Sequence, residues 1–158
     1  MIRTLTSFFL ARCPQGESDD AMTVHATTVC WKGRGLLLRG AAGSGKSDLA
    51  LRLIAQGARL IADDLTTLYR KGDRLEARLP NVPSFFRGKL ALRGAGLLHM
   101  PYRQKTRIHL VADLSPEPSD DPYPSLSCQL MGLTIPRIVC SPFEASADIK
   151  MLYALQQR

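Results

Sequence analysis

Apolar and polar residues along the chain follow two periods, and together they predict a mixed α/β domain. Runs that are rich in β-branched and aliphatic residues, bounded by glycine, proline or polar clusters, are typical of strands. We expect such strands over residues 23–31, 35–38, 59–62, 66–70, 75–79, 90–93, 107–114, 126–130 and 133–139. A glycine loop follows at 94–96, and a proline-rich loop is expected over 115–125.

Helical spacing occurs in two places. Leu49, Leu53 and Ile54 predict a helix that runs to about Gln56, and Gly57 stands where a left-handed C-terminal cap is expected. A second helix is expected over 143–156. Its packing residues would be Ile149, Leu152, Tyr153 and Leu155. Strands outnumber helices, so the predicted fold class is α/β with a mixed, mostly antiparallel-edged sheet, a phosphate-loop helix and a C-terminal helix.

Length and charge restrict the class of protein. The 158 residues suit one domain, for which we expect a disordered extension over 1–21 and a folded domain over 22–158. The net charge of +7 is scattered, without the basic blocks and interleaved aromatic residues typical of nucleic-acid binding. The four cysteines form no C-x-x-C pair, which favours reduced thiols and a cytoplasmic protein, and no apolar run is long enough for a membrane span.

An octapeptide directly after the second expected strand carries the strongest chemical signal. It matches the phosphate-binding pattern G-x-x-x-x-G-K-[ST]. In such loops backbone N–H groups surround phosphate oxygens, the lysine contacts the outer phosphates, and the last hydroxyl can ligate Mg²⁺. The helix that follows adds its N-terminal dipole. We expect a nucleotide-phosphate site formed by Gly40, Ala41, Ala42, Gly43, Ser44, Gly45, Lys46 and Ser47.

Carboxylates that could complete this site follow two apolar strands. Asp63 and Asp64 end one strand, and Asp113 stands near the end of another. Adjacent carboxylates repel, so the Asp63-Asp64 pair is costly without a compensating cation or shared proton, although a simple turn also explains it. A structural role is the better interpretation of Asp113. Taken alone, His25 is more often structural as well, and His99 and His109 have no metal-like spacing.

These features together resemble the catalytic domain of HPr kinase/phosphorylase. The resemblance rests on His25, the 40–47 loop and the Asp63-Asp64 pair, and it extends to residues 86–98 and 135–147. It implies the fold that this family shares with phosphoenolpyruvate carboxykinase. It also implies an ATP-dependent and Mg²⁺-dependent kinase that phosphorylates a serine of the HPr phosphocarrier and in many members also reverses the reaction. Assembly into a hexamer is part of the same expectation.

The resemblance also implies a role for each matching residue. Lys46 would bind phosphate, and Ser47 would ligate Mg²⁺; beyond what the resemblance implies, we expect Asp63 as the second ligand. Asp64 would accept the proton of the target serine, and His25 would help to position phosphate. Apart from the resemblance, Arg93 and Arg137 are the arginines from which we expect further phosphate or substrate contacts.

Two departures from the family pattern leave other functions open. Ala91 stands where the family carries a glutamate ligand of Mg²⁺, and residues 120–124, D-D-P-Y-P, stand where a catalytic arginine is expected. Asp63 or Asp113 would have to compensate for the ligand, and Arg93 or Arg137 for the arginine. The alternatives are a nucleotide-binding regulator with little or no turnover, and a small-molecule kinase that uses the same loop.

Overall fold

The computed structural model describes residues 20–117, 120 and 126–158. The first strand begins at Ala21, so the expected 1–21 extension lies, apart from its last two residues, outside the described part, as does most of the 115–125 loop. The elements are β1 Ala21–Trp31, β2 Arg34–Arg39, α1 Lys46–Ala55, β3 Arg59–Ala62, β4 Leu65–Lys71, β5 Arg74–Arg78, a 3₁₀ turn Ser84–Phe86, β6 Lys89–Leu92, β7 Gly96–His99, β8 Lys105–Leu114, β9 Ser127–Leu130, β10 Leu133–Cys140 and α2 Ala147–Gln156.

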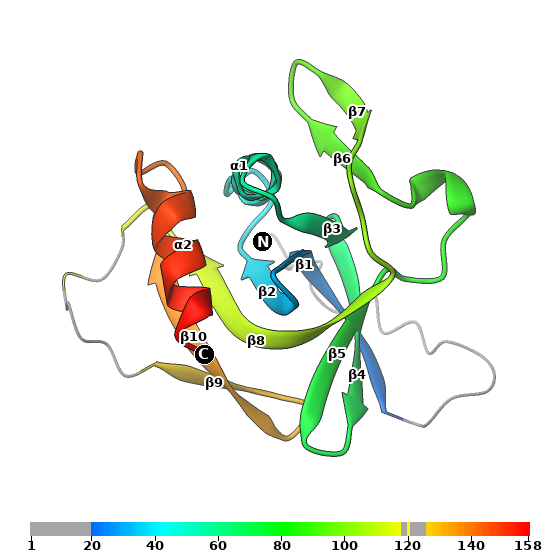
Figure 1. Cartoon of the computed structure of the whole chain (residues 1–158), viewed down its shortest axis with the longest axis vertical. Coiled ribbons are helices and arrows are strands. Elements are labelled where there is room, and N and C mark those ends of the chain that lie inside the picture. Colours follow the sequence, from blue (N-terminus) through cyan, green and yellow to red (C-terminus); the bar gives the residue numbers. More distant parts are fainter. Residues whose placement is uncertain (1–19, 118–119, 121–125) are drawn as a thin grey trace, which may run out of the picture.

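The strands form one eight-stranded mixed sheet and a separate two-stranded hairpin (Figure 1). The long strand β1 pairs with β4 over its first half and with β2 over its second half. Because β4 pairs with β5, β5 with β8, and β8 in parallel with β2, these strands close a ring. β10 continues in parallel beside β8, and β9 forms the antiparallel edge. The expected mixed sheet is confirmed.

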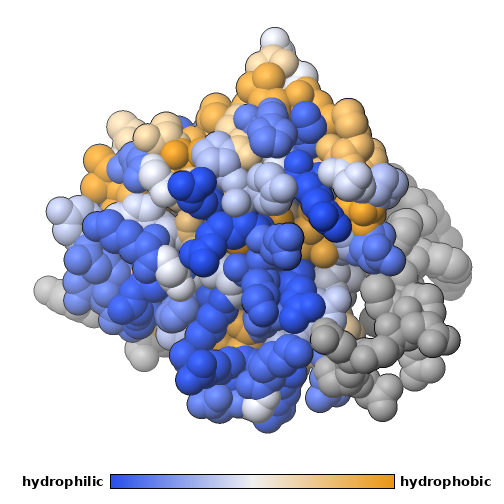
Figure 2. Space-filling view, turned by 45° about the vertical axis from the view of Figure 1, so that its right-hand side comes forward, coloured by the Kyte–Doolittle hydropathy of each residue, from blue (hydrophilic) through white to orange (hydrophobic). Residues whose placement is uncertain are grey.

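The β6–β7 hairpin projects away from this sheet (Figure 1). All four residues of β7 are exposed, among them Leu97 and Leu98, and the neighbouring 3₁₀ turn exposes Phe85 and Phe86. Figure 2 shows apolar residues gathered at the upper end of the molecule, where the hairpin lies, whereas hydrophilic residues cover the lower part. No helix among the described residues is long and apolar enough to cross a bilayer.

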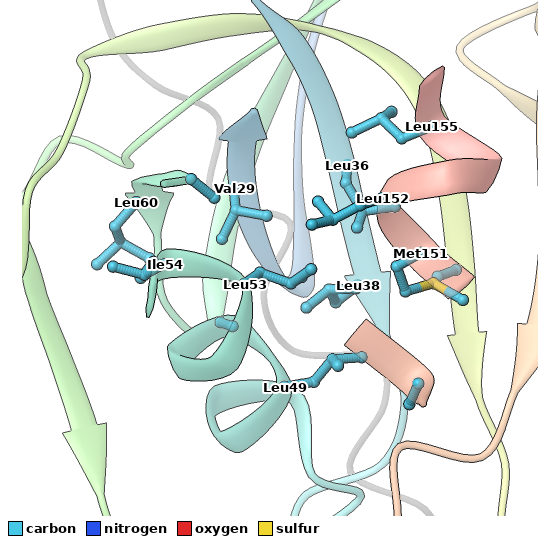
Figure 3. Close-up of a cluster of buried hydrophobic side chains, with 14 of the residues drawn as sticks. Val29, Leu36, Leu38, Leu49, Leu53, Ile54, Leu60, Met151, Leu152 and Leu155 are labelled. Carbon is cyan, nitrogen blue, oxygen red and sulfur yellow. The ribbon is translucent and has the colours of Figure 1, made fainter. Parts of the chain in front are cut away.

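Two apolar clusters occupy the two faces of the sheet. Inside the ring, Leu37 of β2 packs with residues from β1, β4, β5 and β8. On the outer face, α1 and α2 cover β2, and Figure 3 shows Leu36 and Leu38 against side chains of both helices. The expected burial of Leu49, Leu53 and Ile54 is confirmed. This outer packing fixes the start of α1, and therefore the phosphate loop, at the end of β2.

The hairpin strand β7 differs from the prediction of a glycine loop alone. It is exposed throughout, so the alternation of buried and exposed residues that marks a half-buried strand is missing. β7 is held by its pairing with β6, in which Leu90 lies opposite Leu98.

The prediction for the C-terminal helix was wrong at its start and about part of its packing. The helix begins at Ala147 rather than at 143, because turns stabilised by Glu144 N–H···O Ser141 and Ala147 N–H···O Glu144 precede it. Ile149 and Tyr153 are 49% and 66% exposed instead of packed. Burial follows the spacing i, i+4, i+8 on the opposite face, which consists of Ala147, Met151 and Leu155 with Leu152 beside them.

Candidate functional site

The phosphate loop is preformed between β2 and α1. Gly43 and Gly45 take the left-handed backbone conformation, with φ of 78° and 96°, which glycine adopts without steric cost. Gly45 is the N-cap of α1, and its carbonyl accepts the first helical hydrogen bond from Leu49 N at 2.9 Å. The free N–H groups at the start of α1 therefore face the loop, where they can bind an anion.

Lys46 lies across this loop rather than out in solvent. Its Nζ donates hydrogen bonds to the carbonyl oxygens of Gly40 and Ala41, at 2.9 and 3.0 Å, and the residue is only 6% exposed. Burial lowers the pKa of Lys46, and the nearby carboxylates of Asp64 and Asp63 partly offset that effect. The cation is therefore held inside the loop at the end where the outer phosphates of a nucleotide would lie.

Asp63 receives three hydrogen bonds from three different segments. Ser47 is the last residue of the loop, and its Oγ donates a hydrogen bond to Asp63 Oδ1 at 2.9 Å. Thr27 Oγ1 of β1 donates to the same oxygen at 3.0 Å, and the backbone N–H of Ala91 in β6 donates to Oδ2 at 3.1 Å. The carboxylate and the hydroxyl that were predicted to ligate Mg²⁺ are thus in direct contact.

Asp64 differs from Asp63 in backbone conformation and in its partners. Its backbone lies in the left-handed region, with φ of 66°, and its N–H donates to Thr27 Oγ1 at 3.2 Å. Its carboxylate pairs with His25, with 2.5 Å between Nε2 and Oδ1, and its side chain is 66% exposed. The two adjacent carboxylates therefore have separate partners: Asp63 accepts hydrogen bonds, and Asp64 pairs with His25.

A cavity of about 630 Å³ lies over the loop. Its polar wall contains Lys46, Ser47 and Asp64. The remaining wall comes from α1, from the β6–β7 hairpin and from the segment before α2; it consists of Ala42, Gly43, Gly45, Asp48, Leu51, Ala91, Leu92, Arg93, Ala95 and Phe143. Five residues of the predicted loop and the Asp64 carboxylate therefore share one concave site with residues of the β6–β7 hairpin.

The other charged residues named from the sequence separate into two groups. Arg93 lines the cavity beside Gly43, whereas Arg137 is not among the lining residues. Arg137 instead donates to Asp113 Oδ2, and Arg39 donates to both oxygens of the same carboxylate at 2.7 and 2.9 Å. Burial alone would raise the pKa of Asp113, but the hydrogen bonds from Arg39 and Arg137 hold it below its ordinary value.

The structure brings most of the predicted site residues together. The loop, Asp63, Asp64, His25 and Arg93 meet, whereas Arg137 lies in the Asp113 cluster and His109 accepts a hydrogen bond from Gly35 N within the sheet. Sequence reasoning missed Thr27, which is fully buried. It lies two residues after His25, and strand alternation, which places residues i and i+2 on one face, could have identified it. Phe143 was also missed, because it was assigned to the helix.

A known family and several known proteins match the chain. The family described as the HPr serine kinase C-terminal domain matches residues 18–140. HPr kinase/phosphorylase of Chlorobium chlorochromatii is 34% identical in an alignment 138 residues long, which covers 76% of this chain and 40% of that protein. The protein of the same name from Lactobacillus acidophilus is 33% identical in an alignment 117 residues long, which covers 70% of this chain and 34% of that protein.

The fold matches a solved structure as well. The HPr(Ser) kinase/phosphatase of Coxiella burnetii superposes with a TM-score of 0.70 at 24% identity, covering 87% of this chain and 99% of that one. The chain spans about two fifths of the length of the curated relatives from Chlorobium and Burkholderia lata that it matches. On the matched residues, the chain belongs to the family of the HPr serine kinase C-terminal domain.

Proposed function

We propose that this chain is the catalytic domain of an ATP-dependent protein kinase that phosphorylates a serine of an HPr-type phosphocarrier and so regulates carbon metabolism. One observation carries the proposal. A phosphate loop with its lysine, a hydroxyl paired with one aspartate, and a second, exposed aspartate lie in one cavity. Phosphoryl transfer requires these groups: a cradle for phosphate, oxygen ligands for a cation, and a proton acceptor for the attacking hydroxyl.

Ser47 and Asp63 fit a magnesium site. Mg²⁺ prefers hard oxygen ligands and is usually bound by one or two protein groups together with substrate phosphates and water. The 2.9 Å contact between Ser47 Oγ and Asp63 Oδ1 brings two such oxygens together, and the described residues contain no cluster of three or more His, Cys, Asp or Glu side chains that would compete for the ion. Bound there, Mg²⁺ neutralises charge on the phosphates.

Asp64 is the proposed proton acceptor. In the forward reaction the serine oxygen bonds to the γ-phosphorus while the bond from that phosphorus to the β–γ bridging oxygen breaks and ADP leaves. The proton of the serine hydroxyl passes to Asp64. A positioned base typically contributes about 10²–10⁴-fold to such a step. The exposed Asp64 carboxylate can meet a hydroxyl presented by another protein, and His25 fixes the carboxylate orientation through its contact with Oδ1.

Lys46 and Arg93 supply the positive charge in this proposal. Lys46 would exchange its bonds to the carbonyls of Gly40 and Ala41 for bonds to the β- and γ-phosphates, which offer stronger, charge-assisted acceptors. Arg93 extends the positive wall on the hairpin side of the cavity. We propose in addition a cytoplasmic location and a homo-oligomeric, hexameric assembly, both of which rest on family membership.

A second candidate function is a nucleotide-binding regulator with little turnover. Ala91 favours this alternative, since a methyl group lines the cavity where the family carries a glutamate. At this position Asp63 Oδ2 accepts a hydrogen bond from the backbone N–H of Ala91. A small-molecule kinase is the remaining alternative, and no described feature favours it over the other two.

Incubation with γ-labelled ATP, Mg²⁺ and HPr from the same organism tests the proposal. We expect label on one serine of HPr, and no label when that serine is replaced by alanine. Asp64→Asn should abolish labelling while nucleotide binding persists. Binding of ATP by the wild-type protein without any transfer to HPr would reject the kinase and favour the regulator.

A further inference from the structure

We propose that Phe143 forms the nucleobase subsite of this cavity, by stacking its ring on the base of a bound purine nucleotide. The inference rests on the proposed function, because it assigns the base end of a nucleotide whose phosphates the loop would hold. It adds a ligand contact from a segment, between β10 and α2, that belongs to no phosphate-binding motif.

The ring of Phe143 stands beside the phosphate loop and is 70% exposed. Phe143 lines the cavity, and its ring carbon Cε1 lies 3.5 Å from the position that a Cβ on Gly45 would occupy. Pro142, the residue before it, is buried against the same glycine. An apolar ring of this size is therefore held next to the N-terminus of α1 while most of its surface faces the cavity mouth and solvent.

The backbone that carries Phe143 is anchored to the phosphate-loop helix. Arg52 in the last turn of α1 donates a hydrogen bond to the carbonyl oxygen of Pro142. Arg52 also pairs with Asp48, at 3.3 Å, and with Asp148 of α2, at 3.8 Å. The backbone that carries the ring is thus linked to both helices, so little backbone ordering would be needed when a flat ligand stacks on the ring.

The cavity has the two-part chemistry of a nucleotide. The polar lining residues are Lys46, Ser47, Asp48, Asp64 and Arg93, which include cations for phosphates and oxygen atoms for a metal ion. The apolar lining residues are Ala42, Leu51, Ala91, Leu92, Ala95 and Phe143. Stacking of a base on an aromatic side chain is tolerant of base identity, because every base has a π-face. We therefore expect the subsite to accept adenine and guanine alike, so it would contribute affinity rather than base selection.

A second exposed aromatic residue provides a matched control. Tyr153 of α2 is 66% exposed, close to the 70% of Phe143, but it does not line the cavity. Removal of either ring takes away a similar exposed apolar surface and leaves the core intact. Only the substitution of Phe143 should weaken nucleotide binding.

Isothermal calorimetry with two ligands tests the proposal. MgATP contains base and phosphates, whereas magnesium tripolyphosphate contains only the phosphates. Phe143→Ala should weaken MgATP binding by about 5- to 100-fold, the loss typical of one stacked base, and leave tripolyphosphate binding unchanged. Phe143→Trp should retain MgATP affinity, and Tyr153→Ala should bind both ligands as the wild type does.

Every other outcome overturns the subsite. Equal weakening of both ligands by Phe143→Ala would mean that the ring supports the loop instead of binding the base. Unchanged MgATP affinity in Phe143→Ala would mean that the base binds elsewhere and that the ring is available to contact another protein. The proposed phosphate site would not be affected by that result. If the wild-type protein bound neither ligand, the cradle would fail, and the proposed function and the base subsite would fail with it.

Discussion

The hydroxyl of Ser47 lies 2.9 Å from a carboxylate oxygen of Asp63, although the two residues belong to different elements. Ser47 stands at the start of α1, and Asp63 follows β3. The pairing of β3 with β1 and the packing of α1 on the sheet bring them together. Two oxygen ligands thereby meet at the phosphate end of the cavity, at the point where a cation would bridge protein and nucleotide.

Asp63→Asn should therefore raise the Mg²⁺ concentration needed for half-maximal activity by about 10–100-fold, a loss typical of groups that tune a metal site. The amide keeps the shape of the side chain and removes the charge. Asp73→Asn, on the exposed turn between β4 and β5, makes the same change in net charge and should leave the Mg²⁺ requirement unaltered. Titration of activity with Mg²⁺ measures both. An unchanged requirement in Asp63→Asn would remove Asp63 from the cation site.

Thr27 should act as a positioning residue for the two aspartates. Its hydroxyl donates to Asp63 and accepts from the backbone N–H of Asp64. Thr27→Val keeps the shape, removes both bonds, and should lower kcat by about 10²-fold, the cost of a small misplacement of reacting groups, with little change in KM for ATP. Thr27→Ser should restore activity.

Thr28→Val is the matched control for that change. Thr28 is equally buried, and its hydroxyl bonds to Thr66 at 2.9 Å, away from the carboxylates. Both valine variants should lose about 1–3 kcal/mol of stability, since each removes a buried hydrogen bond. Equal losses of kcat in the two variants would show a general effect on stability and contradict the positioning role.

Ala91→Glu should increase turnover at limiting Mg²⁺. The Ala91 side chain lines the cavity and its N–H is bonded to Asp63 Oδ2, so a glutamate there would bring a third oxygen ligand to the cation. Ala91→Gln, which adds the same bulk without charge, is the control. If the two variants gave equal rates, the missing glutamate would not limit this protein.

Asp113→Asn should destabilise the fold in a pH-dependent way. The pKa of Asp113 is below its ordinary value in the folded protein, so the ionised carboxylate contributes stability above about pH 4, and this contribution is lost as the pH falls through the lowered pKa. At pH 7 the variant should lose about 1–3 kcal/mol, because Arg39 and Arg137 lose their charged acceptor.

Denaturant unfolding across pH measures this difference. The difference in free energy of unfolding between wild type and Asp113→Asn should become smaller below about pH 4, because the wild-type carboxyl group is then protonated and uncharged, like the amide. The side chain of Asp73 is 89% exposed, so Asp73→Asn should differ from the wild type in free energy of unfolding by a small amount that does not change with pH. A gap for Asp113→Asn that stayed constant with pH would contradict the ionised cluster.

Much of this fold could be predicted because the phosphate loop and several strands and helices are each marked by residues within their own segment. The phosphate loop is recognised from its G-x-x-x-x-G-K-[ST] pattern alone. The elements β1, β8 and α1 have clear apolar patterns that end at glycine or polar residues. The position of Asp63 and Asp64 at a strand end indicated that they could complete the phosphate site, but no local pattern in either segment predicted the direct contact between Ser47 and Asp63.

Features that depend on distant pairing could not be predicted in this way. Arg137 reaches Asp113 because β10 runs parallel to β8 with these strands in register, a relationship between segments that carry no shared signal. The exposed strand β7 has no buried face to mark it. Phe143 looked helical because apolar residues continue into α2, whereas the turns after Ser141 delay the helix and leave the ring over the cavity.

Calorimetric titration of MgATP into the wild-type protein and into Lys46→Ala tests the central claim most directly. Lys46 is the one cation held inside the phosphate loop among the described residues. The account predicts saturable binding to the wild type and a loss of at least about tenfold in affinity in Lys46→Ala, in line with the value of one charge-assisted contact. Absence of heat with the wild type, or equal affinity for the two proteins, would contradict it.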